Sequence, residues 1–180
     1  YENVFKLLDL SPKIPDKIRP DENTIESLKD FKSEINAIFD ISKITKYHID
    51  NIDESFFKKG YSNEIDDLQI KCDNTKKKLE AICKKFSKLC NQEIDTIFKI
   101  DYTDRDGYSL SGTQTRCKLL KQKITNFAEN NIIIDVYDLS FPIDAKSIQF
   151  KNTTNSKTKI DSPTISGLCQ DYRNYKNKIG

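Results

Sequence analysis

Cysteine is the residue type in this sequence with the clearest capacity for covalent chemistry, and the chain carries five cysteines in 180 residues. Cys72, Cys83 and Cys90 fall on one stretch of helical pattern. At a rise of about 1.5 Å per residue, Cys83 and Cys90 lie about 10.5 Å apart along such a helix, whereas a disulfide requires Cα atoms within about 7 Å. Any intramolecular bridge must therefore involve Cys117 or Cys169.

The expected pairing of these cysteines is Cys90–Cys117 and Cys83–Cys169, because Cys117 is nearer in sequence to the open end of the long helical hairpin expected upstream. Cys72 would then remain a small thiol that fills space in the core. Disulfides of this kind belong to an oxidising compartment. The alternative is five reduced, buried thiols in an intracellular protein.

The other polar residues give little support for metal binding or catalysis. The sequence has no Cys-x-x-Cys pair and a single histidine, His48, so no zinc site is predicted. Asp104, Asp106 and Gly107 resemble the middle of a calcium loop, but the residues at both ends of that loop are not carboxylates, so a surface turn is expected. We therefore predict no enzyme, no metal and no cofactor.

Basic residues are concentrated in a stripe on one predicted helix, where residues 74–90 carry six lysines against Glu80 alone. A second basic group lies among the tyrosines near the end of the chain. The seven candidate binding residues are Lys77, Lys78, Lys84, Lys85, Lys88, Arg173 and Lys176. Charge runs are usually solvated helix faces, but this one also fits binding to an anionic surface such as a sialylated or sulfated glycan, a phosphoinositide or an acidic protein.

The residues that must position this stripe form two successive heptads between Lys77 and Cys90, KKLEAIC and KKFSKLC. Their apolar positions line one side of a helix, and a seam of this kind requires a partner helix. The segment directly upstream, from Phe31 to Phe56, repeats the same spacing of apolar residues. Lys58-Lys59-Gly60 is a strong helix stop between the two segments. The sequence thus predicts two long antiparallel helices joined by a short connection.

We predict a mainly α fold, a helical bundle in one domain spanning residues 1–180. The hairpin helices are expected at about 22–59 and 62–99, a third helix at about 114–130 and a C-terminal helix at about 163–178. Between the last two, a small β-hairpin is expected at about 132–150, with its turn at Phe141-Pro142. The domain then comprises an N-terminal helix with a proline-rich connection (1–20), the hairpin (21–100), and packing helices with an irregular segment (101–180).

Overall charge and hydropathy argue against a nucleic-acid partner and against a membrane-spanning helix. The net charge is only +2, so there is no global field to attract nucleic acid, and no nucleic-acid partner is predicted. No apolar run approaches the roughly 20 residues needed to span a membrane as a helix. The chain has no methionine, and Tyr1 opens directly into a helical pattern, so we interpret it as a mature or excised domain.

The lysine-, isoleucine- and asparagine-rich segments KKKLEAICKKFSKLC, NNIIIDVYDL and KNTTNSKTK resemble the helical ectodomains of merozoite surface antigens of malaria- and piroplasm-type parasites. That resemblance implies a secreted or GPI-anchored surface antigen that acts in cell adhesion by binding a host-cell protein or an anionic glycan. Its location would be extracellular or at the cell surface. The alternative is a cytoplasmic helical adaptor or scaffold that acts through its long hairpin.

Overall fold

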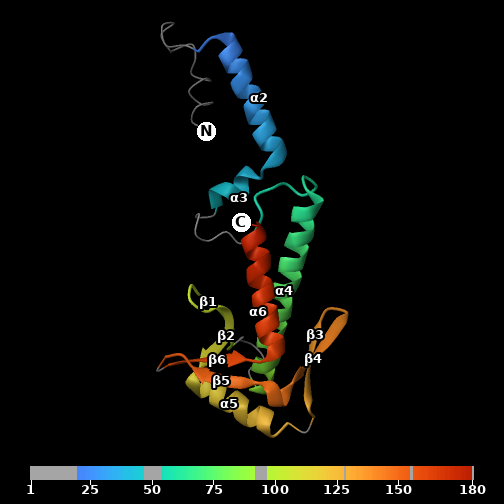
Figure 1. Ribbon diagram of the computed structural model, residues 1–180, viewed down its shortest axis with the longest axis vertical. Helices are drawn as coiled ribbons and strands as arrows, with labels where there is room; N and C mark the ends of the chain where they lie inside the picture. The colour runs from blue at the N-terminus through green and yellow to red at the C-terminus, as the bar shows by residue number, and fades with distance from the viewer. Residues whose placement is uncertain (1–19, 47–53, 92–96, 128, 155, 180) are drawn as a thin grey trace. The chain divides into compact units, whose positions relative to one another are not determined.

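The computed structural model describes residues 20–46, 54–91, 97–127, 129–154 and 156–179 (Figure 1). The chain divides into two compact units, residues 1–62 and 63–180. Each unit has its own set of internal contacts. His48 lies outside the described residues.

The described residues of the first unit form two helices, α2 (Glu22–Ile38) and α3 (Ile41–Lys46). Helix α2 begins at Asp21, whose side chain accepts a hydrogen bond from the Thr24 backbone N–H at 2.7 Å, as an N-cap residue does. It ends at Ile38. The backbone of the next residue, Phe39, is extended and pairs with Phe57 in an isolated β-bridge.

The continuous helix predicted from residue 22 to 59 is therefore wrong. Asp40 follows the bridge, and its carboxylate accepts hydrogen bonds from the backbone N–H groups of Ser42 and Lys43, which starts a new helix. A capping aspartate competes with the helical backbone for these donors, and the apolar spacing of the segment did not reveal that competition.

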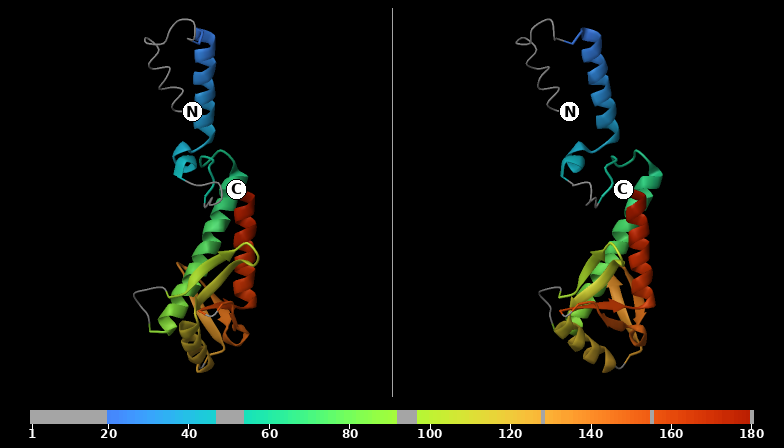
Figure 2. Two further views of the ribbon diagram at one scale, coloured as in Figure 1. Left: turned by 90° about the vertical axis from the view of Figure 1, so that its left-hand side faces the viewer. Right: turned by 60° about the vertical axis from the view of Figure 1, so that its left-hand side comes forward.

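Two antiparallel helices, α4 (Asn63–Leu89) and α6 (Pro163–Ile179), form the long axis of the second unit, and both figures place them side by side (Figures 1 and 2). Helix α4 buries Cys72, Thr75, Leu79, Ile82, Cys83, Phe86 and Ser87. Three of the four apolar heptad positions, Leu79, Ile82 and Phe86, are among them, whereas the fourth, Leu89, is half-buried. Helix α6 buries Ile165, Cys169 and Tyr172.

Within the second unit, α4 packs against the C-terminal helix α6. The predicted hairpin is wrong, because its first helix is interrupted after Ile38 and its second ends at Leu89. A heptad pattern identifies a face that must be buried, but it does not say which element covers that face. Helix α2 has no buried residue among its seventeen. The second helix also ends ten residues earlier than predicted, at Leu89, shortly before Asn91 with a φ of 59°.

A four-stranded antiparallel sheet lies against one end of the α4–α6 pair (Figure 1). Its strands are β1 (Lys99–Thr103), β2 (Gly107–Thr113), β5 (Gln149–Asn152) and β6 (Lys157–Asp161), in the order β1-β2-β6-β5. The residues 104–106 form the turn between β1 and β2. One face of the sheet packs into the core, where Ile100, Leu110, Ile160 and Phe150 are consecutive register partners across the four strands.

Helix α5 (Gln114–Thr125) follows β2 directly and begins at Thr113, whose hydroxyl accepts from the Arg116 backbone N–H. Its buried residues Cys117, Leu120 and Ile124 join the core below the sheet. The backbone of β2 at Gly112 lies close to the side chain of Phe98, because a Cβ added to Gly112 would lie 2.7 Å from the ring of Phe98. The helix starts where the sequence predicts it and ends five residues earlier than the predicted 130.

A separate two-stranded hairpin, β3 (Asn131–Val136) and β4 (Leu139–Asp144), precedes a short 3-10 helix, η3 (Ala145–Ser147). Ile132, Ile134 and Ile143 from the hairpin are fully buried. The turn lies at residues 137–138, and Pro142 pairs with Ile133 inside the hairpin. The predicted turn at Phe141-Pro142 is therefore wrong, and the strand containing Phe150 belongs to the larger sheet.

The fold is mixed α/β, and the prediction of a mainly helical bundle is wrong. None of the helices in the described ranges has the length and apolar character needed to cross a membrane.

Candidate functional site

The outward face of the four-stranded sheet carries a row of lysines. Side chains alternate between the two faces of a strand, so the residues next to the apolar ladder point the other way. Lys99 is the register partner of Ser111, Ser111 of Lys159, and Lys159 of Lys151. At about 4.8 Å between strands, the row from Lys99 to Lys151 spans roughly 14 Å. We call Lys99, Lys159 and Lys151 the lysine row.

A hollow of about 450 Å³, which we call the sheet hollow, adjoins one end of this row. Its lining comprises Ile97, Lys99, Asp101, Ser111, Gly112, Thr113, Arg116, Ser156 and Lys157. Three cations and one carboxylate therefore face the same space. Arg116 projects from the first turn of α5 and is exposed. The side chains are positioned by three elements, β1, β2 with the following helix, and β6.

Asp101 is the acidic member of the sheet hollow, and its neighbours keep it ionised. Its carboxylate forms an ion pair with Lys157 and accepts a hydrogen bond from the Ser111 hydroxyl at 2.7 Å. Burial opposes ionisation, but these two hydrogen bonds and the charges of Lys157 and Lys99 outweigh it, so the pKa of Asp101 lies below its usual value. Lys157 is thus partly neutralised, whereas no ion pair is observed for Lys99 or Arg116 among the described residues.

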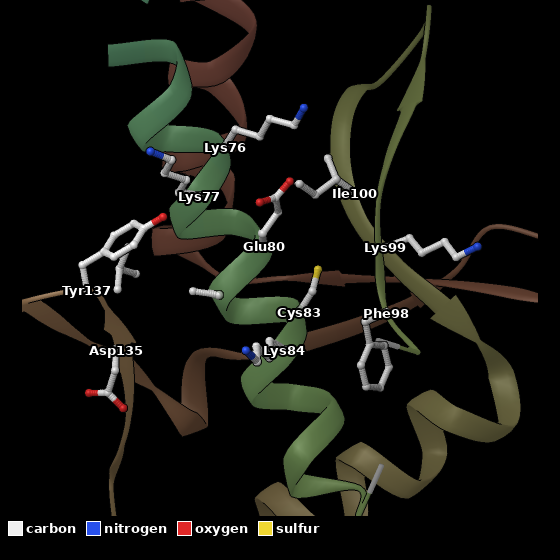
Figure 3. A pocket seen from close by; sticks show the side chains of 12 residues that line it. Lys76, Lys77, Glu80, Cys83, Lys84, Phe98, Lys99, Ile100, Asp135 and Tyr137 are labelled. Carbon is white, nitrogen blue, oxygen red and sulfur yellow. The ribbon is translucent and has the colours of Figure 1, made fainter. Parts of the chain in front are cut away.

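A larger hollow of about 820 Å³, which we call the helix hollow, lies between α4, the start of β1 and the end of β3 (Figure 3). Its apolar lining includes Ala81, Phe98, Ile100 and Val136. Its polar lining consists of the side chains of Lys76, Lys77, Glu80, Lys84, Lys99, Asp135 and Tyr137. Lys99 lines both hollows, and Figure 3 shows its side chain directed away from α4.

The seven basic residues predicted from the sequence do not form one surface. Lys77 and Lys84 line the helix hollow, Lys88 is exposed, and Lys78 and Lys85 are half-buried.

The two basic residues predicted on the C-terminal helix pack against β2. Arg173 packs against Gly107, since its Nη1 would lie 3.2 Å from a Cβ added there. Lys176 places its ammonium 5.8 Å from the ring centre of Tyr108 and 6.0 Å from that of Tyr172. These two cations are therefore engaged with aromatic and backbone groups of the same unit.

All five cysteines are buried thiols, and the predicted disulfides Cys90–Cys117 and Cys83–Cys169 are wrong. Burial raises the pKa of Cys83 to about 12, and the charges of Cys169 and Glu80 add to the effect. Burial likewise raises the pKa of Cys117 to about 11, with Cys90 as the second cause. The expected partners thus lie near enough to interact electrostatically, but each thiol serves as a small apolar side chain of the core.

We therefore expect five reactive thiols per chain in denaturant without reductant, because no cysteine is held in a bridge. The native protein at pH 8 should react slowly, since thiolates are the reactive form and the pKa of Cys83 is about 12. Counting with a thiol reagent, before and after treatment with reductant, checks both statements. A single thiol before reduction would indicate two bridges and contradict the structure.

Sequence reasoning missed the lysine row and the sheet hollow. Lys99 falls at the end of a predicted helix, and residues 151–162 fall between the predicted β-hairpin and the predicted C-terminal helix, where no strand is expected. A signal was present in Lys157-Thr158-Lys159-Ile160, where polar and buried residues alternate as in a half-buried strand. In the described part of the chain, no three His, Cys, Asp or Glu side chains come together as metal ligands.

No family model matches the chain. The chain is similar to a protein of Acanthamoeba polyphaga mimivirus named as a putative DNA mismatch repair protein and mutS homolog, with 28% identity over 149 residues. The alignment covers 77% of this chain, which spans 13% of the length of that protein. Neither comparison points to a merozoite surface antigen, so that resemblance remains a prediction from composition.

Proposed function

We propose that this chain is a DNA-contacting segment of a larger repair protein, and that the lysine row with Arg116 binds the phosphate backbone of duplex DNA. The observation that carries this proposal is the register of the sheet, which aligns Lys99, Lys159 and Lys151 on one outward face. Lysine and arginine are the side chains that neutralise phosphates in protein–DNA interfaces.

Local charge supports this proposal even though the net charge of the chain is only +2. Five cations lie on the outward face of the sheet or at its edge: Lys99, Lys151, Lys157, Lys159 and Arg116. Two carboxylates, Asp101 and Asp161, accompany them, and they bind Lys157 and Lys159. The excess of three positive charges over a short distance favours an anionic partner, which the small overall charge did not suggest.

Similarity to a relative named for DNA mismatch repair supports DNA as that anionic partner. Contacts of this kind position a protein on DNA without reading sequence, because phosphates are the same at every base pair. The role we propose is binding and not catalysis, in line with the non-enzymatic function expected from the sequence.

Fluorescence anisotropy with the full chain and a labelled 20-base-pair duplex tests the proposal. Four phosphate contacts, one from each lysine of the row and one from Arg116, predict a slope of about −3.6 in a plot of log affinity against log salt, so binding should weaken roughly 150-fold between 50 and 200 mM salt. Two duplexes of unrelated sequence should bind within about threefold of each other. Absence of binding at 50 mM salt, or binding that is insensitive to salt, would contradict the proposal.

Our second proposal is the anionic cell-surface partner expected from the sequence. The lysine row would bind sulfate groups as readily as phosphates. Heparin immobilised on a column distinguishes the two. Elution from heparin at higher salt than is needed to release duplex DNA would favour the glycan.

A further inference from the structure

An exposed tyrosine stands at the tip of the β3–β4 hairpin in a backbone conformation that tyrosine rarely adopts. Tyr137 is the first residue of the two-residue turn, has a φ of 52°, and is 83% exposed. Glycine and asparagine fit this left-handed region with the least strain. A bulky residue held in such a conformation with its ring in solvent indicates a use for the ring.

The ring of Tyr137 lies at the helix hollow, close to a cluster of lysines (Figure 3). The ammonium of Lys77 is 5.4 Å from its ring centre, which is within the range of a cation–π contact. Lys76 and Lys84 line the same hollow from α4, about two helical turns apart. An aromatic ring, apolar side chains and three cations therefore line the same hollow.

We propose that the helix hollow binds an unpaired nucleotide of single-stranded DNA, with the base stacked on Tyr137 and the flanking phosphates bound by Lys77 and Lys84. Stacking on exposed aromatic rings beside basic residues is the general mode of single-strand binding. This inference rests on the proposed function, because Lys99 lines both hollows and joins this site to the lysine row that binds duplex.

The polar lining of the helix hollow favours a nucleotide over an acidic peptide. Glu80 and Asp135 face this space with the lysines. Their carboxylates can accept hydrogen bonds from the N–H groups of a base, whereas they would repel the carboxylates of an acidic peptide placed at the same depth. The volume of about 820 Å³ lies within the range of small-molecule sites.

The test uses the full chain and two labelled single strands of twelve units, one of thymidine and one of abasic spacer with the same number of phosphates. Wild type should bind the thymidine strand more tightly than the abasic strand. Tyr137→Asn keeps a residue suited to the turn but removes the ring, and it should weaken thymidine-strand binding by roughly 5- to 100-fold. Tyr137→Phe keeps the ring and should bind as wild type does.

The abasic strand separates stacking from charge, since Tyr137→Asn should leave its affinity unchanged. Circular dichroism and melting of each variant report on folding. Equal binding of the thymidine strand by wild type and Tyr137→Asn would overturn this inference, while salt-dependent duplex binding would still support the proposed function. Displacement of the thymidine strand by an equal concentration of a twelve-residue polyglutamate would also overturn it.

Discussion

Replacement of Phe86 with alanine is expected to lower the free energy of unfolding of the second unit by about 3–5 kcal/mol, as for large buried side chains elsewhere. Phe86 is 0% exposed and lies on the face of α4 that meets the core. Its ring packs edge-to-face on Phe98, with centroids 6.3 Å apart. The substitution therefore leaves a cavity where the helix meets the segment that leads into β1.

Urea unfolding followed by circular dichroism measures this loss. Leu119→Ala is the matched control in the same unit, because Leu119 is 37% exposed on α5 and its truncation leaves no enclosed cavity. A loss of about 1 kcal/mol or less is expected for the control. If the two variants were equally destabilised, the buried face of α4 would be wrongly assigned.

Local sequence patterns predicted which residues of the second unit are buried better than they predicted what covers them. Leu79, Ile82 and Phe86 are fully buried as the heptads require. Ile165 and Cys169 on the C-terminal helix are buried as well. Each of these residues belongs to a helix whose apolar stripe repeats within a few turns, so the signal lies entirely inside one short segment.

The sheet could not be predicted in the same way, because its pairing is non-local. Leu110 on β2 pairs with Ile160 on β6, fifty positions later in the chain. Strands β5 and β6 have only four and five residues, and most are lysine, asparagine or threonine. Such segments resemble loops when read alone, since strand formation depends on neighbours more than on intrinsic preference.

In the candidate site as well, the sequence indicated the residues on a helix and missed those on the sheet. Helix periodicity placed Lys77 and Lys84 outside the buried face, and both line a hollow. The lysine row, by contrast, exists only because three strands bring Lys99, Lys151 and Lys159 into register. No spacing in the sequence connects residues 99 and 151, so this surface appears only once the topology is known.

Replacement of the whole lysine row with alanine should therefore have the largest effect on DNA binding. Each phosphate contact contributes about 0.9 to the salt slope, so loss of three contacts should lower the slope by about 2.7. Near 0.1 M salt this corresponds to a weakening of roughly two to three orders of magnitude. Stability should change little, because Lys99 and Lys151 are exposed and Lys159 is half-buried.

A second triple variant removes the same charge from elsewhere in the unit. Lys71, Lys146 and Lys178 are exposed on α4, η3 and α6, outside the lysine row and both hollows. Their replacement with alanine should weaken duplex binding by less than about threefold, since charges beyond a Debye length of about 8 Å are screened at physiological ionic strength. Anisotropy titrations of both variants at 50, 100 and 200 mM salt make the comparison. Similar losses in the two would show that overall charge and not the aligned row attracts the DNA.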